Sequence, residues 1–293
     1  MADPVRYRSA DEDSARWRTF EHRPGDIVIS TRSKHGTTWM QMICALLVLQ
    51  RADLPAPLAR LSPWLDWRVE PRAAVFDRLQ AQRHRRFIKT HTPLDGLPLH
   101  PRVTYIVVAR HPLDAALSLY HQSANIDRRR LAELTGGSTP SPGHEQPSPA
   151  EWLRAWIAAD PAPADALDSL PGVLHHLSDA WARRHDLDVV FVHYDSLLGN
   201  LGAEMQQLAA HLSIPIEPAR LAGLVAAATF ESMRSRADLL APDPMGVLID
   251  RDRFFRAGVS GQARVQLTGA DLARYGERTA AHAPTDLVEW LHG

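Results

Sequence analysis

The sequence contains a single cysteine, Cys44, among its 293 residues. It can form no intramolecular disulfide, and no second thiol is available to bind zinc with it, which fits a reducing compartment. The longest apolar stretch, residues 39–49, is interrupted by Gln41 and is too short to span a bilayer. The N-terminal residues mix charges and lack the apolar run of a signal peptide. We therefore expect a cytoplasmic protein without an integral membrane segment.

The chain also lacks an excess of charge of either sign. Lys and Arg number 33 against 34 Asp and Glu. Proteins that bind polyanions depend on a strong positive field, so nucleic acid is not expected as a partner. A local basic pocket for one nucleotide would not show in this sum. Open α/β folds of this length have one core, so we expect a single domain over residues 1–293.

Four short apolar segments predict β-strands, and helical patterns separate them. The expected strands are 27–30, 86–89, 103–109 and 189–193, and the expected helices are 37–50, 73–83, 112–122 and 197–212, with a further helix-like run at 269–291. Continuously apolar strands are typical of a sheet covered on both faces. The alternation predicts an α/β fold with a central parallel sheet flanked by helices. In such sheets, ligands bind beyond the carboxyl ends of the strands.

One polar stretch, residues 123–150, interrupts this alternation. It contains DRRR followed by GGSTPSPGHEQPSP, a composition that buries too little apolar surface to order itself. We expect a flexible loop here. Either it is a lid over the active site, or it is a surface insertion without a role.

The first expected strand is followed by STRSKHGTTW at residues 30–39. A glycine-containing loop that leads into a helix presents free backbone N–H groups and the positive end of the helix dipole to an anion. Lys34 adds a charge, and Thr37 and Thr38 add hydroxyl groups. The alternative is an ordinary turn with a solvated lysine. The lysine precedes Gly36, so the segment does not match the GxxxxGK[ST] motif.

His91 and Arg110 follow the next two strands. The pKa of a histidine suits proton abstraction near neutral pH, although a lone histidine is more often structural. Arg110 offers a planar set of donors to a phosphate group, and Ser118 can reach the same cleft from the following helix. The alternative for Arg110 is an ion pair with Asp114.

Taken together, these segments resemble the motifs of the cytosolic-type sulfotransferases, in the same order, and the chain is most similar to bacterial members of that family. The matching segments are KHGTTW at 34–39, KTH at 89–91, ARHPLDAALSLY at 109–120, HYDSL at 193–197 and FFRAGVSG at 254–261. The resemblance implies a three-layer, P-loop-like fold. It also implies transfer of a sulfonate group from 3′-phosphoadenosine 5′-phosphosulfate (PAPS) to a hydroxyl of a small acceptor, such as a phenol, an alcohol or a glycolipid. The nucleotide product is 3′-phosphoadenosine 5′-phosphate (PAP).

The resemblance further implies roles for individual residues. It places Lys34, Gly36, Thr37 and Thr38 at the 5′-phosphate, Trp39 and Phe230 on the adenine, Tyr194 near the base, and Arg110, Ser118, Arg256 and Gly258 at the 3′-phosphate. His91 falls on the general base of the family. Lys34 and Lys89 would neutralise charge on the transferred group. No metal is expected, because the donor has no β,γ-phosphates for magnesium to bridge and the sequence shows no evident carboxylate pair to hold such an ion.

The sequence departs from the family pattern at three positions near these motifs. Ser33 and His35 stand where proline and serine are usual, and Ala257 occupies a site that is generally lysine. The missing lysine weakens the expected 3′-phosphate site unless Arg253 or Arg264 replaces it.

The dimerisation motif of the family is also poorly kept near the C-terminus. Arg264 and Thr268 match this motif, but Gly269 and Ala273 replace its valine and glutamate. The sequence therefore leaves a homodimer open.

Two other functions are compatible with parts of the pattern. A P-loop-type kinase or NTPase would need a lysine after the glycine and an acidic residue where Arg110 follows the third strand. A non-catalytic nucleotide-binding protein would not need His91.

The acceptor pocket is expected to be lined by residues 52–75, 123–150 and 235–253. Trp64, Trp67 and Phe76 point to an apolar or aromatic acceptor, with structural aromatics as the more common alternative.

Overall fold

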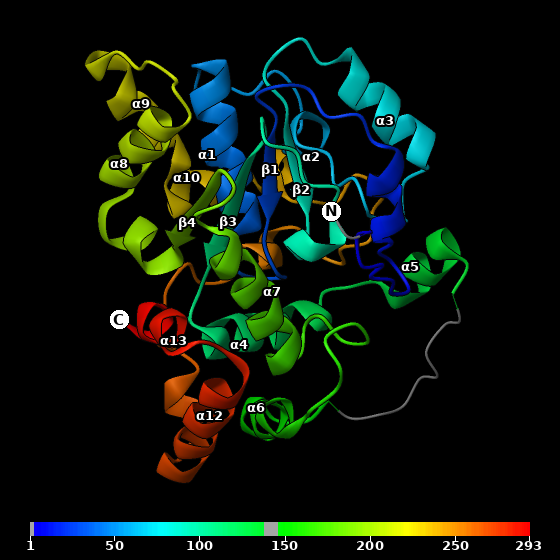
Figure 1. Ribbon diagram of the computed structural model, residues 1–293, viewed down its shortest axis with the longest axis vertical. Helices are drawn as coiled ribbons and strands as arrows, with labels where there is room; N and C mark the ends of the chain where they lie inside the picture. Colours follow the sequence, from blue (N-terminus) through cyan, green and yellow to red (C-terminus); the bar gives the residue numbers. More distant parts are fainter. Residues whose placement is uncertain (1–2, 138–145) are drawn as a thin grey trace.

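The computed structural model describes residues 3–137 and 146–293. Its centre is a parallel four-stranded sheet in the order β2-β1-β3-β4 (Figure 1). The strands are β1 (Ile27–Ser30), β2 (Phe87–Thr90), β3 (Thr104–Ala109) and β4 (Val189–His193). All four predicted strands are confirmed to within one residue at each end. Because β1 lies between β2 and β3, the residues that follow these three strands meet at one edge of the sheet.

Helices cover both faces of the sheet, which gives three layers. The helices are α1 (Thr37–Leu49), α2 (Leu58–Leu61), α3 (Arg72–Ala81), α4 (Pro112–Ser123), α5 (Arg128–Thr135), α6 (Pro149–Ala158), α7 (Leu170–Arg183), α8 (Tyr194–His211), α9 (Pro218–Ala228), α10 (Phe230–Arg234), α11 (Ala237–Leu240), α12 (Gly269–His282) and α13 (Thr285–His292), with 3-10 turns η1 (Ser14–Thr19), η2 (Leu94–Gly96), η3 (Asp252–Phe254) and η4 (Arg264–Gln266). No described helix is long and apolar enough to cross a membrane.

Alternate residues of β1 belong to different apolar cores. Ile27 and Ile29 pack into a core with side chains of α1, α8 and α9, whereas Val28 packs into a second core with α4, α6 and α7. Figure 1 shows the first group of helices at the upper left and the second group in the lower half. Successive side chains of a strand point to opposite faces of the sheet. Because helices cover both faces, the strands are apolar along their length, as expected.

Two expected helices differ from the observed ones. α8 begins at Tyr194, three residues earlier than expected, because the His193 side chain accepts a hydrogen bond from the Asp195 backbone N–H at 3.2 Å and caps the helix. The expected run at 269–291 is two helices, α12 and α13. They separate at Pro284, which has no backbone N–H to continue the first helix and precedes the second.

The expected flexible loop at 123–150 is wrong for the part that contains α5. The Asp127 carboxylate accepts a hydrogen bond from the Arg130 backbone N–H at 2.9 Å and begins this helix. Leu131 and Leu134 then pack against the apolar cluster of Trp67, Val69 and Val247. Two leucines with helical spacing thus give the basic segment an apolar face. The polar composition of the whole segment did not indicate this face, so a loop was expected instead of a helix.

The remainder of the expected loop consists of the start of a helix and a part that the structure does not describe. Ser148 and Glu151 form a capping box, and α6 begins between them at Pro149. Residues 138–145, which hold most of the Pro- and Gly-rich sequence, lie outside the described residues. The lid therefore remains a prediction.

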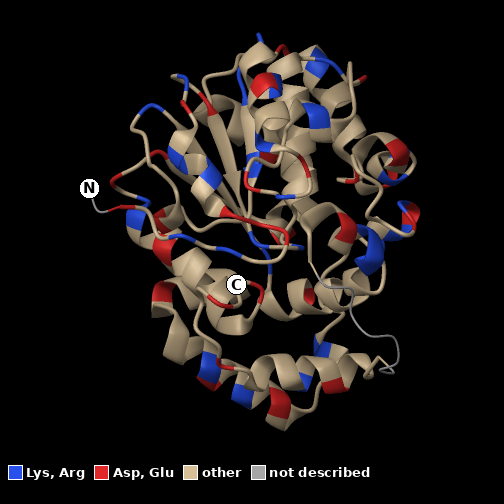
Figure 2. Cartoon of the chain, turned by 90° about the vertical axis from the view of Figure 1, so that its right-hand side faces the viewer, with Lys and Arg blue, Asp and Glu red and all other residues tan. Residues whose placement is uncertain are grey.

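Charged residues of both signs are interspersed over the described chain. Figure 2 shows Lys and Arg alternating with Asp and Glu, without a face of one sign. This distribution agrees with the formal net charge of −1. Any electrostatic selectivity must therefore arise within a local pocket.

Candidate active site

A cavity of about 840 Å³ opens at the carboxyl ends of β1, β2 and β3. It is lined by every residue that the sequence predicted for the site, namely Lys34, Gly36, Thr37, Thr38, Trp39, Lys89, His91, Arg110, Ser118, Tyr194, Phe230, Arg256 and Gly258. The volume lies in the upper part of the roughly 300–1,000 Å³ range of small-molecule sites. The structure thus brings the predicted residues together around one space.

The loop after β1 bends at two residues with positive φ. Lys34 has φ 66° and Gly36 has φ 105°. A Cβ atom on Gly36 would lie 3.0 Å from the Tyr194 ring, so this position needs glycine for its conformation and for space. Gly36 precedes α1, and no side chain of the described residues caps this helix end. The first backbone N–H groups of α1 are therefore available to an anion beside the cavity.

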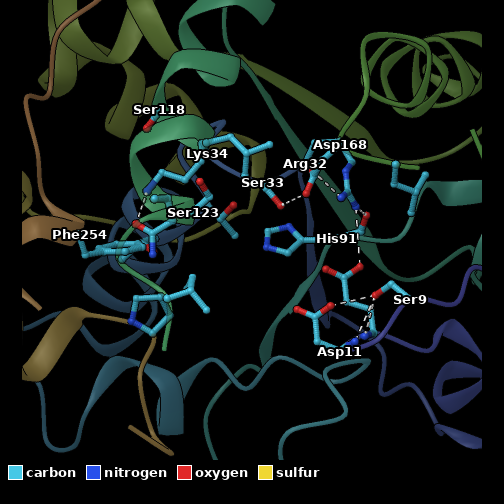
Figure 3. A pocket seen from close by; sticks show the side chains of 18 of the residues that line it. Ser9, Asp11, Arg32, Ser33, Lys34, His91, Ser118, Ser123, Asp168 and Phe254 are labelled. Atoms are coloured by element: carbon cyan, nitrogen blue, oxygen red, sulfur yellow. Dashed lines mark hydrogen bonds and ion pairs between the residues drawn. The ribbon is translucent and has the colours of Figure 1, made fainter. Parts of the chain in front are cut away.

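Three cationic side chains reach one end of the cavity, which we call the donor end. The Lys34 Nζ lies 4.2 Å from the centroid of the Phe254 ring and 3.4 Å from Gln122 Oε1. Figure 3 shows Lys34 and Phe254 together on one side of His91. The Arg256 guanidinium donates to Gln262 Oε1 at 2.8 Å.

Arg110 is the third cation, and it is buried. Its guanidinium stacks 4.4 Å from the centroid of the Tyr194 ring and donates to the Val259 backbone oxygen at 2.7 Å. Its Nε is buried without a hydrogen-bond partner among the residues that the structure describes. The alternative ion pair with Asp114 is not formed, because Asp114 accepts hydrogen bonds from the backbone N–H groups of residues 261 and 263 at 2.7 and 3.0 Å.

These cations have no carboxylate partner in the described chain, and their proximity lowers the pKa of the central lysine. Burial, followed by the positive charges of Arg110, Lys89 and Arg256, lowers the pKa of Lys34 to about 7. Burial likewise lowers the pKa of Lys89 to about 8. An excess of buried positive charge of this kind is relieved when an anion binds.

Aromatic side chains line the same end. The Trp39 indole donates to the Ala228 backbone oxygen at 2.8 Å and meets the Tyr194 ring edge to face, with centroids 5.3 Å apart. The Phe230 ring lies over Gly258, where a Cβ atom would be 2.5 Å from the ring. Gly258 has φ 64°, so the backbone approaches the ring only because this residue is glycine.

His91 lies in the middle of the cavity wall and is only 5% exposed. Its Nδ1 contacts the Thr31 backbone oxygen. A carbonyl oxygen only accepts, so Nδ1 carries the proton and Nε2 keeps its lone pair. Burial, followed by the charges of Lys89 and Arg32, holds the pKa of His91 well below its usual value. The imidazole is therefore neutral at pH 7 and can accept a proton on Nε2.

Residues 24–284 match the sulfotransferase domain family. The chain belongs to the sulfotransferase family. It is 42% identical to a glycolipid sulfotransferase of Mycobacterium bovis and equally to one of Mycobacterium tuberculosis, over 100% of this chain and 95% of each relative. It is 27% identical to sulfotransferase 1A1 of Canis lupus familiaris, over 87% of this chain and 82% of the relative. The enzyme class that the sequence motifs indicated is thereby confirmed.

Solved structures share the fold of this sulfotransferase. A retinol dehydratase in complex with androsterone and the inactive cofactor PAP gives a TM-score of 0.69 at 18% identity, over 92% of this chain and 83% of that one. Mouse sulfotransferase SULT7A1 complexed with PAP gives 0.68 at 21% identity, over 95% and 92%. These likenesses confirm the P-loop-like α/β fold.

The other end of the sulfotransferase cavity, which we call the acceptor end, was predicted less well. Trp64 and Trp67 line the cavity as expected, and their rings stack with centroids 4.9 Å apart. Phe76 does not line it, because its ring packs against Phe20 at 5.5 Å. The segments 7–12 and 152–169 contribute lining residues that sequence reasoning missed. Neither segment carries a motif that could have identified it.

Two arginines were the candidates to replace the lysine that is missing at Ala257. Neither Arg253 nor Arg264 is among the described residues that line the cavity. Arg253 instead forms an ion pair with Asp250 at 3.4 Å. Arg128, at the start of α5, does line the cavity.

Proposed function

We propose that this sulfotransferase takes its sulfonate group from PAPS and transfers it to a hydroxyl of a glycolipid, with His91 as the general base. The observation that carries the proposal is the position of a buried, neutral histidine in one cavity with Lys34 and Arg110, two cations that lack carboxylate partners among the described residues. The names of the mycobacterial relatives support a glycolipid acceptor. The PAP bound in the two solved structures is consistent with the donor.

The residues at the donor end fit an anionic nucleotide. In the described chain the buried Nε of Arg110 lacks a partner and the start of α1 is uncapped, so both offer unused donors. In this proposal Lys34, Gly36, Thr37 and Thr38 bind the 5′-phosphate, Arg110, Ser118, Arg256 and Gly258 bind the 3′-phosphate, and Trp39, Phe230 and Tyr194 surround the adenine. PAPS, when bound, supplies a sulfonate group on a phosphate leaving group.

His91 accepts the proton of the acceptor hydroxyl on Nε2 as the oxygen attacks the sulfur atom. The Thr31 carbonyl keeps the ring in place and stabilises the imidazolium that forms. Lys34 and Lys89 stabilise the negative charge on the leaving phosphate and on the transferred group. No step in this scheme calls for a metal.

The two alternative functions are less consistent with the site. Membership of the sulfotransferase family argues against a kinase or NTPase, and the lysine precedes the glycine of the loop. A free imidazole nitrogen in the cavity is of no use to a protein that only binds nucleotide.

Transfer from labelled donor tests the proposed function. The protein is incubated with PAPS or ATP and with a series of glycolipids, phenols and simple alcohols, and the products are identified by mass spectrometry. We expect sulfated glycolipid and PAP in equal amounts, and no product from ATP. Phosphorylated product from ATP, or PAP binding without any sulfated product, would contradict the proposal.

A further inference from the structure

The acceptor end differs from the donor end in carrying carboxyl groups. Those that line the cavity belong to Asp11, Glu12, Asp165 and Asp168. Figure 3 shows Asp11 and Lys34 on opposite sides of His91. A hydroxyl that approaches His91 from this side therefore enters surroundings rich in hydrogen-bond acceptors.

Glu12 is held firmly by its backbone, but its carboxyl group is without a hydrogen bond. The Glu12 backbone N–H donates to Ser9 Oγ at 3.0 Å, and residue 12 forms an antiparallel bridge with Trp67. Its side chain is 14% exposed, and the Arg32 guanidinium is 3.9 Å away, beyond hydrogen-bonding distance. Throughout residues 3–137 and 146–293, no hydrogen bond to this carboxyl group is formed. Solvent in the cavity reaches its oxygens, so a ligand that enters can form hydrogen bonds to them.

Arg32 does not form the missing bond, because its two terminal nitrogens bond other groups and its buried Nε has no hydrogen-bond partner among the described residues. Its guanidinium donates to Asp168 Oδ1 at 2.6 Å and to the His91 backbone oxygen. The guanidinium nitrogen that binds the His91 oxygen is also the one nearest to Glu12. Glu12 therefore lies one guanidinium group away from the His91 backbone.

The local charge favours hydroxyl groups over an ammonium group as the partner. Asp168 is neutralised by Arg32 and accepts a further bond from Ser33 Oγ at 3.0 Å. Burial raises the pKa of Glu12 to about 8, since burial and the nearby carboxylates outweigh the attraction of Arg32. A protonated carboxyl group both donates and accepts, which suits the hydroxyls of a carbohydrate.

An apolar wall lies beside this carboxyl group. The stacked rings of Trp64 and Trp67 form it. Lys89 Nζ lies 3.7 Å from the centroid of the Trp64 ring, and the His91 ring stands nearly perpendicular to that of Trp64, with centroids 4.6 Å apart. Among the described residues, the buried Trp64 Nε1 has no hydrogen-bond partner. An aromatic wall next to unused donors and acceptors complements a ring that carries both C–H groups and hydroxyls.

We propose that Glu12 is a specificity-determining residue of the acceptor site, where its carboxyl group hydrogen-bonds a second hydroxyl of the sugar that presents the reacting hydroxyl to His91. The chain then selects polyhydroxylated acceptors over phenols and simple alcohols. This inference rests on the proposed function, because it takes the side of His91 opposite Lys34 as the acceptor side.

Two acceptors with the same octyl chain, one a sugar and one a simple alcohol, test the inference. These are octyl β-D-glucoside and 1-octanol, each assayed with PAPS in the wild type and in Glu12→Met, which keeps most of the side-chain volume. We expect the variant to lower kcat/KM about tenfold for the glucoside and less than about threefold for octanol. Glu12→Gln, which can still donate and accept, should stay within about threefold for both acceptors. Glu21→Ala, which removes an exposed carboxylate, is the matched control and should change neither.

Several outcomes overturn the proposal. An equal loss of kcat/KM for both acceptors in Glu12→Met would show a merely structural role. A kcat/KM that stays at the wild-type value for both acceptors would show that Glu12 does not contact the acceptor. Titration with PAP and thermal melting confirm that each variant is folded. If Glu12→Met fails to fold, monodeoxy octyl glucosides on the wild type provide the test. At least one should lose about tenfold in kcat/KM, and uniform rates across the series would refute the idea.

Failure of the proposed function gives a different result. In that case the wild type sulfates no acceptor, although it binds PAP. Calorimetric binding of octyl glucoside to the PAP complex then still tests Glu12. About tenfold weaker binding in Glu12→Met supports the inference, and equal binding rejects it.

Discussion

The two ends of the cavity are formed in different ways. At the donor end, Lys34, Arg110 and the start of α1 follow directly from strand ends, and the charges there are cationic. At the acceptor end, the lining comes from residues 7–12, from Trp64 and Trp67, and from the segment 152–169, with charges of both signs. The position of the donor end is fixed by the sheet. The acceptor end depends on how distant loops pack, so it can vary while the sheet and its ligand site stay constant.

His91 lies between these two ends, and its removal should give the largest effect. We expect His91→Ala to lower kcat about 10²-fold or more, as for the loss of a positioned general base. PAP affinity should stay within a few-fold, because His91 is not at the donor end. Single-turnover rates and PAP titration measure the two quantities. Turnover equal to that of the wild type would exclude His91 as the base.

Replacement of Arg110 should show which of the two phosphates of the nucleotide this residue binds. Arg110→Ala is expected to weaken PAP binding by about 2 kcal/mol, or about 30-fold, since hydrogen bonds to charged groups contribute about 1.5–3 kcal/mol. Binding of adenosine 5′-phosphate should change only a few-fold. Calorimetry on both nucleotides gives the comparison, with Arg253→Ala, outside the cavity, as the control. A parallel loss for both nucleotides would show that Arg110 does not bind the 3′-phosphate.

The contrast between the ends also explains what the sequence could predict. The strands were predicted because buried parallel strands are continuously apolar, and once they are placed, the carboxyl-end rule brings Lys34, His91 and Arg110 together. α5 was missed because its apolar face rests on only Leu131 and Leu134 within a strongly basic segment. Glu12 could not be identified, because nothing near it in sequence indicates that it packs beside Arg32 and Trp67.

Two glycines with positive φ, Gly258 at the donor end and Gly246 outside the cavity lining, allow the cost of conformation to be separated from the cost of packing. Gly258 and Gly246 have φ of 64° and 69°, but of the two only Gly258 has a neighbour, the Phe230 ring, within 4 Å of the position that a Cβ atom would take. Gly246→Ala should therefore cost about 1 kcal/mol of unfolding free energy, and Gly258→Ala about 1 kcal/mol more. Only Gly258→Ala should also weaken PAP binding. Denaturant unfolding and PAP titration measure both effects, and equal costs would show that the ring moves aside freely.

The smallest expected effect is a pH dependence of nucleotide binding at the donor end. The pKa of Lys34 is lowered to about 7 without ligand by burial, followed by the positive charges of Arg110, Lys89 and Arg256. A bound phosphate favours the charged amine and raises this pKa, so binding takes up a proton above pH 7. PAP affinity should then fall about fivefold from pH 7 to pH 8, as expected when one group with an initial pKa near 7 must be protonated.

Calorimetry in two buffers with different ionisation enthalpies measures the proton uptake directly. Lys34→Gln should reduce it without abolishing it, since the pKa of Lys89 is lowered to about 8. Proton release on binding, or an affinity independent of pH, would mean that Lys34 does not contact the phosphate.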